Sequence, residues 1–145
     1  MLDLNLIETI VVIMMENRSF DNMLGHLSCP WYDNRNEVDG LTPPLKREEY
    51  ENLFEGETYY PHAMKDRMLP SDLPHNRDDV TTQIAKSDVT GKFGMNGFVE
   101  AYYTLTQTNR KQKTEPMGYF PPDQVPITNF LANNYAVCDR WFSPL

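Results

Sequence analysis

The hydrophobic positions of the chain form one dense run near the N-terminus and several shorter amphipathic segments after it. Residues 6–15, LIETIVVIMM, show little alternation of apolar and polar side chains, and they are too few to span a membrane as a helix. Such a run is typical of a central strand in a parallel sheet, which helices cover on both faces. The apolar segment AVCDRWF, near residues 136–142, predicts a second strand parallel to the first and beside it.

Four segments between these runs carry helical signals. Ser19 suits an N-terminal cap and not a nucleophile, because no base stands beside it. Asn76 is a second candidate N-cap, and Pro126 fits the first turn of a helix. The predicted helices cover residues 17–27, residues 76–87, the chain from Phe98 onward and the chain from Pro126 onward.

The stretch from Cys29 to Pro74 shows no lasting period and is rich in Pro, Asp, Asn and Tyr. A loop of that length without structure of its own is usually functional or disordered. Its many aromatic residues argue against disorder. We therefore predict that residues 29–74 form a long ordered loop excursion over the ligand edge of the sheet.

These elements predict an α/β fold with a partial parallel sheet and flanking helices. The length of 145 residues allows one domain at most. Two strands are too few to fill a parallel sheet that is covered on both faces. Residues 1–145 are therefore interpreted as an incomplete part of a single domain, whose remainder would be its partner.

Composition narrows the function classes. A net charge of -8 and scattered basic residues argue against a nucleic-acid partner, because binding phosphates requires clustered Lys and Arg. No segment predicts an integral membrane span or a signal peptide, which would make the protein cytoplasmic if Met1 is the true start. Cys29 and Cys138 could pair, but free buried thiols are the favoured interpretation.

Two polar residues directly follow the first predicted strand. Ligands of parallel sheets bind beyond the carboxyl ends of the strands, which is where Glu16 and Asn17 would stand. Their carboxylate and amide oxygens suit a divalent cation such as Ca²⁺, Mg²⁺ or Mn²⁺, or a phosphate held against one. The alternative is that Glu16 caps the next helix and Asn17 makes a turn.

The segment MMENRSFDNMLG resembles the start of the phosphoesterase family, which holds bacterial phospholipases C and an acid phosphatase within the alkaline-phosphatase-like superfamily. Three further segments resemble that family in the same order: LPHNRDDVTTQ, GMNGFVEAY and MGYFPPDQVPITNFLANNYAVCDRWFSPL. The likeness covers nearly the whole chain and is weakest across residues 30–70. Asn96 stands where the family usually has Asp, and Thr9 where a His is common.

The resemblance implies the N-terminal portion of an alkaline-phosphatase-like fold. It assigns Glu16 and Asn17 to a divalent metal site and places His75 in the active site, where an imidazole could protonate a leaving alkoxide or hold a phosphoryl oxygen. The alternative for His75 is a surface histidine in a polar loop. For Asp139, the favoured role is to orient its neighbours, and the alternative is a direct ligand role. The implied Ser or Thr nucleophile, and an Asp pair that completes the metal site, lie beyond residue 145.

The function implied by the resemblance is metal-dependent hydrolysis of phosphate esters. Phospholipase C-like cleavage of a phosphodiester is favoured and acid phosphatase comes next, with a phosphate ester or a phospholipid headgroup as substrate. The aromatic-rich residues 30–62 would then shape a headgroup pocket. Two alternatives are a non-catalytic binding module and an inactive truncated product. The resemblance leaves the localisation open, since related enzymes are often secreted.

Overall fold

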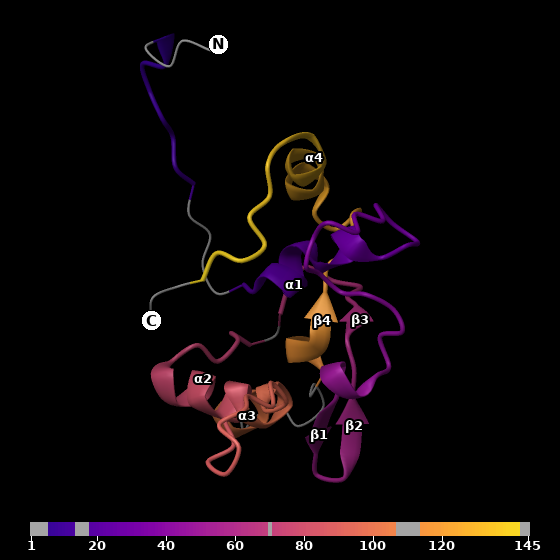
Figure 1. Ribbon diagram of the computed structural model, residues 1–145, viewed down its shortest axis with the longest axis vertical. Helices are drawn as coiled ribbons and strands as arrows, with labels where there is room; N and C mark the ends of the chain where they lie inside the picture. Colours follow the sequence, from indigo (N-terminus) through magenta and orange to yellow (C-terminus); the bar gives the residue numbers. More distant parts are fainter. Residues whose placement is uncertain (1–5, 14–17, 70, 107–113, 143–145) are drawn as a thin grey trace.

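The computed structural model describes residues 6–13, 18–69, 71–106 and 114–142, and Figure 1 shows how their helices and strands are arranged. The predicted sites Glu16 and Asn17 lie outside these residues. Within them, four α-helices surround two small sheets. The helices are α1 (Phe20–Leu24), α2 (Arg77–Ile84), α3 (Phe98–Thr106) and α4 (Pro126–Asn134); the short 3-10 helices are η2 (Gly25–Ser28), η3 (Glu48–Tyr50) and η4 (Glu115–Met117).

Both sheets have two strands. Strands β1 (Asn52–Phe54) and β2 (Glu57–Tyr59) pair antiparallel, whereas β3 (His62–Ala63) and β4 (Gly118–Tyr119) pair in parallel. The parallel pair joins segments that are more than fifty residues apart in the chain. The α/β class with a partial parallel sheet and flanking helices is therefore confirmed.

The antiparallel pair is a tight hairpin that the sequence analysis did not predict. Its two loop residues, Glu55 and Gly56, have φ angles of 51° and 80°. Two consecutive positive φ angles match the right-handed twist of a two-residue hairpin, and the second is easily adopted by glycine. Strands of three residues are too short to show alternation in the sequence, which explains the omission.

The predicted helices are confirmed, with shorter bounds for the first two. The Ser19 hydroxyl accepts a hydrogen bond from the backbone N–H of Asn22 at 3.2 Å, so Ser19 is the cap of α1. After Leu24 the α-helix gives way to η2 at Gly25. Helix α2 begins with a capping box between Asn76 and Asp79, which satisfies two backbone N–H groups.

The core lies around α1 and η2, and α1 stands between α4 and β4 in Figure 1. One cluster contains the buried residues Leu27, Val38 and Ala132, so that it joins η2 to α4. A second contains Cys29, Leu41 and Tyr119, which joins the chain after η2 to β4. Segments from both ends of the sequence therefore pack against the same short helical unit, α1 and η2, which is called the hub below.

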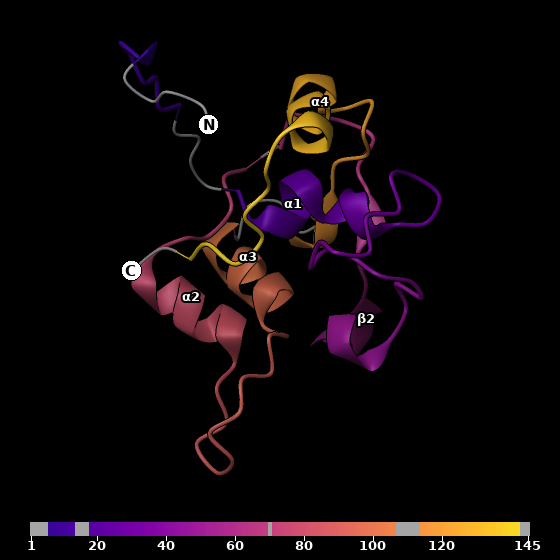
Figure 2. The same cartoon turned by 45° about the horizontal axis from the view of Figure 1, so that its top comes forward.

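The structure contradicts the prediction of two apolar strands. Residues 7–13 form no strand and are exposed, and residues 14 and 15 lie outside the described residues. In both Figures 1 and 2 this segment extends away from the other elements. Residues 136–142 form no strand either, and Trp141 and Phe142 are exposed. A strand needs hydrogen-bonded neighbours, and no described segment pairs with either run.

The thiol prediction is half right. Both cysteines are free, but Cys29 is buried and Cys138 is exposed. Cys138 belongs to the apolar run that the structure leaves without a covering layer, and this explains the difference. As for the membrane, none of the helices among the described residues is long and apolar enough to cross one.

Helix α3 depends on a cap from a distant strand. The side-chain Oδ1 of Asn52, in β1, accepts hydrogen bonds from the backbone N–H groups of Phe98 at 2.8 Å and Val99 at 3.3 Å. Asn52 and Val99 are completely or almost completely buried. The first N–H groups of a helix have no partner within the helix, so this one side chain satisfies two of them.

We expect Asn52→Ala to lower the free energy of unfolding by about 1–3 kcal/mol, because it leaves two buried N–H groups of α3 without an acceptor. Chemical denaturation followed by circular dichroism measures this. The matched control is Asn134→Ala on α4, whose exposed side chain bonds only to the carbonyl of Phe130. The control should change stability by less than about 0.5 kcal/mol. Equal losses in the two variants would contradict the capping role.

Candidate functional site

The structure describes only His75 of the three predicted site residues Glu16, Asn17 and His75. Because Glu16 and Asn17 are not among the described residues, their convergence with His75 stays a prediction. In the part of the chain that the structure describes, no group of three or more His, Cys, Asp and Glu side chains could hold a metal ion. The divalent cation therefore rests on the resemblance and on the oxygen donors of Glu16 and Asn17.

His75 lies in the loop that leads into α2, and its side chain is half exposed. The ring Nδ1 lies 2.7 Å from the carbonyl oxygen of Leu73 and 3.8 Å from a carboxylate oxygen of Asp72. A carbonyl oxygen only accepts, so Nδ1 carries a hydrogen and donates a hydrogen bond to the Leu73 carbonyl. Among the described residues, none bonds to the other ring nitrogen, Nε2. A histidine oriented through one nitrogen, with the other free to exchange a proton, is the arrangement that acid–base chemistry requires.

The loop that carries His75 is held on both sides. The side chain of Gln83, in α2, donates a hydrogen bond to the carbonyl oxygen of Pro74 at 2.7 Å. The backbone N–H of Leu73 donates to Asp72 Oδ1 at 3.0 Å, and Asn76 begins the capping box of α2. These local contacts fix the backbone around an imidazole that is itself open to solvent.

A polar groove of about 470 Å³ lies elsewhere on the molecule. It is lined by residues 36–40 together with Thr42, Arg47, Tyr50, Asp139 and Arg140, and His75 is not among its lining residues. Arg47 donates to the Thr42 hydroxyl at 3.1 Å and lies 4.2 Å from the centre of the Tyr50 ring. Carboxylates and guanidinium groups share its walls, so the groove suits a polar ligand that carries charges of both signs.

Asp139 connects the C-terminal part of the chain to this groove. Its carboxylate accepts a hydrogen bond from the backbone N–H of Asp39 at 2.7 Å, and the neighbouring Arg140 lies 3.3 Å from the Asp39 carboxylate. Asp139 thus fixes two segments that are one hundred residues apart in the sequence. This is the orienting role that the sequence analysis favoured for it.

Sequence reasoning missed the rest of the groove. Asp39, Arg47 and Tyr50 lie in the stretch that was predicted as one long loop, where no spacing or period distinguishes them. The only signal was general: an ordered loop rich in aromatic and charged residues is usually functional. Their meeting with Asp139 is a tertiary event that no local pattern could show.

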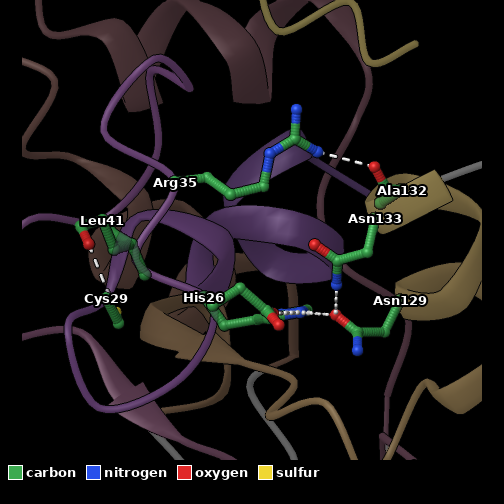
Figure 3. Close-up of polar contacts among 8 residues, drawn as sticks. His26, Cys29, Arg35, Leu41, Asn129, Ala132 and Asn133 are labelled. Carbon is green, nitrogen blue, oxygen red and sulfur yellow. Dashed lines mark hydrogen bonds and ion pairs between the residues drawn. The ribbon is translucent and has the colours of Figure 1, made fainter. Parts of the chain in front are cut away.

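A buried polar cluster fastens α4 to the hub (Figure 3). His26 is fully buried, and its Nε2 lies 2.8 Å from Asn129 Oδ1, which also accepts from Asn133 at 3.2 Å. Arg35 donates to the Ala132 carbonyl at 2.6 Å. Ser28 is buried nearby, but its hydroxyl makes no hydrogen bond to the histidine or to any other described residue. The cluster is therefore a packing device and not a nucleophile with its base.

The buried cysteine is also chemically inert. Burial raises the pKa of the Cys29 thiol to about 11, and the nearby charge of Asp21 adds to the rise. The protonated thiol points to the carbonyl oxygen of Leu41, with the sulfur 3.2 Å from it (Figure 3). Since the thiolate is the nucleophilic form, Cys29 is excluded as a nucleophile at neutral pH.

Comparison with known proteins supplies the family context of these features. The model of the Phosphoesterase family matches residues 7–145. Non-specific phospholipase C1 of Arabidopsis thaliana is 34% identical over 139 residues, which cover 94% of this chain and 24% of that protein. Non-specific phospholipase C3 of the same plant is 32% identical over 146 residues, covering 96% of this chain and 27% of that protein.

The chain thus spans about a quarter of the length of the curated relatives that it matches. Non-specific phospholipase C4 of Arabidopsis thaliana gives the same proportion, at 30% identity and 26% coverage of that protein. No solved structure matches the chain significantly.

The difference in exposure between His75 and His26 gives a direct test of the His75 geometry. We expect diethyl pyrocarbonate to modify His75 before His26, because the ring of His75 is half exposed and no described residue bonds to its Nε2, whereas His26 is fully buried. Modification of His26 should be at least about tenfold slower and should follow local unfolding. Mass spectrometry of peptides measures both rates, and His75→Gln should remove the fast phase. Faster modification of His26 would contradict the structure.

Proposed function

The chain belongs to the Phosphoesterase family, and from that premise we propose that it forms part of an enzyme that hydrolyses phosphoric esters. The observation that carries the proposal is the family match, which extends from residue 7 to residue 145 and so includes every candidate residue discussed above. Relatives at about 30% identity are named non-specific phospholipases C. We therefore favour phosphodiester cleavage of the phospholipase C type over phosphomonoester hydrolysis.

The proposed reaction begins with attack on the phosphorus of the substrate by a Ser or Thr oxygen, which the resemblance places beyond residue 145. A divalent cation, with Glu16 and Asn17 as proposed ligands, would supply stabilisation of the negative charge that develops on the phosphoryl oxygens. The bond from phosphorus to the leaving oxygen breaks, and water later releases the phosphoryl group from the protein oxygen.

His75 is proposed as the acid that protonates the leaving oxygen. Its Nδ1 is already committed to the Leu73 carbonyl, so proton exchange with a substrate is confined to Nε2. A ring that takes up a proton at Nε2 can hand it to the leaving alkoxide, and Asp72 beside Nδ1 helps to keep the ring in orientation. The half-exposed position leaves room for a substrate to reach Nε2.

The groove beside Asp139 is the proposed place for a polar headgroup. Most of its lining comes from residues 36–50, which lie in the aromatic-rich stretch that the sequence analysis proposed as the wall of a headgroup pocket. Its guanidinium and carboxylate groups would bind a headgroup that carries both a phosphate and an amine.

The role of Glu16 can be tested in a chimera in which this chain replaces the matched region of non-specific phospholipase C1. We expect Glu16→Gln to lower turnover of a nitrophenyl phosphodiester by about a hundredfold or more, because it removes a charged metal ligand but keeps the shape of the side chain. Titration with Ca²⁺, Mg²⁺ or Mn²⁺ should restore part of the activity.

The matched control for that experiment is Glu8→Gln, which removes the same charge from an exposed position in the same segment. This control should keep the activity of the chimera. If Glu16→Gln is as active as the control, the metal site has been assigned to the wrong residue.

The 145-residue chain alone should not release nitrophenol from either a phosphomonoester or a phosphodiester. Phosphoryl transfer needs a nucleophile, a charge-stabilising cation and an acid, and groups that act as a unit lose nearly all activity when one is missing. A colorimetric assay with each divalent cation added in turn measures this. Robust turnover by the purified chain would show that the nucleophile lies within residues 1–145.

A further inference from the structure

Helix α4 leaves an apolar face in solvent. Its inward side carries Asn129 and Ala132, which contact His26 and the Leu27 cluster. Its outward side carries Ile127, Phe130 and Leu131, which are 76%, 60% and 48% exposed. A surface helix normally buries its apolar stripe and leaves its polar side in water. In α4 the apolar side chains of Ile127, Phe130 and Leu131 are in solvent, while Asn129 and Ala132 make the contacts with the rest of the molecule.

The contacts of α4 prevent it from rolling to hide that face. Asn129 is bonded to the buried His26, and the carbonyl of Ala132 accepts a hydrogen bond from Arg35. Rolling the helix about its axis would break both and leave a buried imidazole without its partner. Figures 1 and 2 show α4 at one end of the molecule, with α1 on its inner side. The orientation is therefore set by the fold of the hub.

We propose that the face formed by Ile127, Phe130 and Leu131, here called the α4 face, is an internal packing surface for the part of the phosphoesterase domain that the relatives possess in addition to the matched region. Those relatives are about four times as long as the stretch that this chain matches. They therefore contain enough polypeptide to cover a helix with an apolar layer, as an α/β domain requires.

Two other occupants fit the α4 face less well. A second copy of the chain would need about 800 Å² of buried surface per partner for a stable dimer, and one side of a nine-residue helix offers much less. Helices that lie in a membrane surface usually carry Lys or Arg on their polar side. Residues Pro126–Asn134 carry no charge at all, and Asn129 is already bonded to His26.

The test measures accessibility of the α4 face by cysteine labelling and does not depend on catalysis. In a Cys138→Ser background, which removes the exposed thiol, Phe130→Cys and the control Val89→Cys are introduced separately. Val89 is 95% exposed and lies in a turn after α2, whereas Phe130 is 60% exposed, so both thiols are open to the reagent and each is compared with itself in the two formats. The remaining thiol, Cys29, is buried.

We expect both thiols to react rapidly with a maleimide in the 145-residue chain. When the remainder of non-specific phospholipase C1 is supplied, either fused as the chimera or added in trans, Phe130→Cys should react at least about tenfold more slowly while Val89→Cys should stay fast. Unchanged labelling of Phe130→Cys in both formats would overturn the proposal.

Two further results would also overturn it. Protection of Phe130→Cys that rises with the concentration of the 145-residue chain would identify a second copy as the occupant. Protection of the isolated chain by phosphatidylcholine vesicles would identify a lipid surface. Because the readout is accessibility, a chimera that protects residue 130 but hydrolyses no ester supports the packing surface and counts against the proposed function alone.

Discussion

Asn22 holds the fold together at the point where the two ends of the sequence meet. Its side-chain amide donates to the Gly118 carbonyl at 2.7 Å, and its backbone carbonyl accepts from the N–H of Phe120 at 2.8 Å. These bonds fasten α1 to β4 across almost a hundred residues of sequence. Since β4 then pairs with β3, the parallel sheet depends on this attachment. The buried residue Asn22 thus ties the start of the chain segment that separates α1 from β4 to the end of that segment.

The same hub determines the orientation of α4 and thereby which of its apolar side chains are exposed to solvent. Buried His26 and partly buried Arg35 each take a hydrogen-bond partner from α4, the Asn129 side chain and the Ala132 carbonyl. A small domain with limited core volume thus uses polar contacts to position a helix, and its apolar side chains remain for another layer. The apolar side chains of residues 6–13, Trp141 and Phe142 are exposed as well. The sequence thus contains more apolar side chains than the core of the described residues buries.

The two candidate regions differ in how they are built. His75 is oriented by neighbours within a few residues, namely Asp72, Leu73 and the capped start of α2. The groove is built from segments far apart in sequence, with Asp139 bonded to the backbone of Asp39. A local arrangement can persist in an incomplete domain, whereas a groove depends on every segment that forms it. Catalysis as proposed would require both regions together with the segments that the relatives possess in addition.

Local physics explains what the sequence by itself determined about this protein. Ser19, Asn76 and Pro126 marked the starts of three helices, because caps and first-turn prolines act within one helical turn. The family motifs were equally legible, because they are contiguous strings. Only the tertiary structure decided that the Glu55–Gly56 turn makes a hairpin, that Asn52 caps a distant helix and that Asp139 meets Asp39. It also left the apolar run at 7–13 exposed, since hydrophobicity states a preference for burial but only neighbouring segments can supply it.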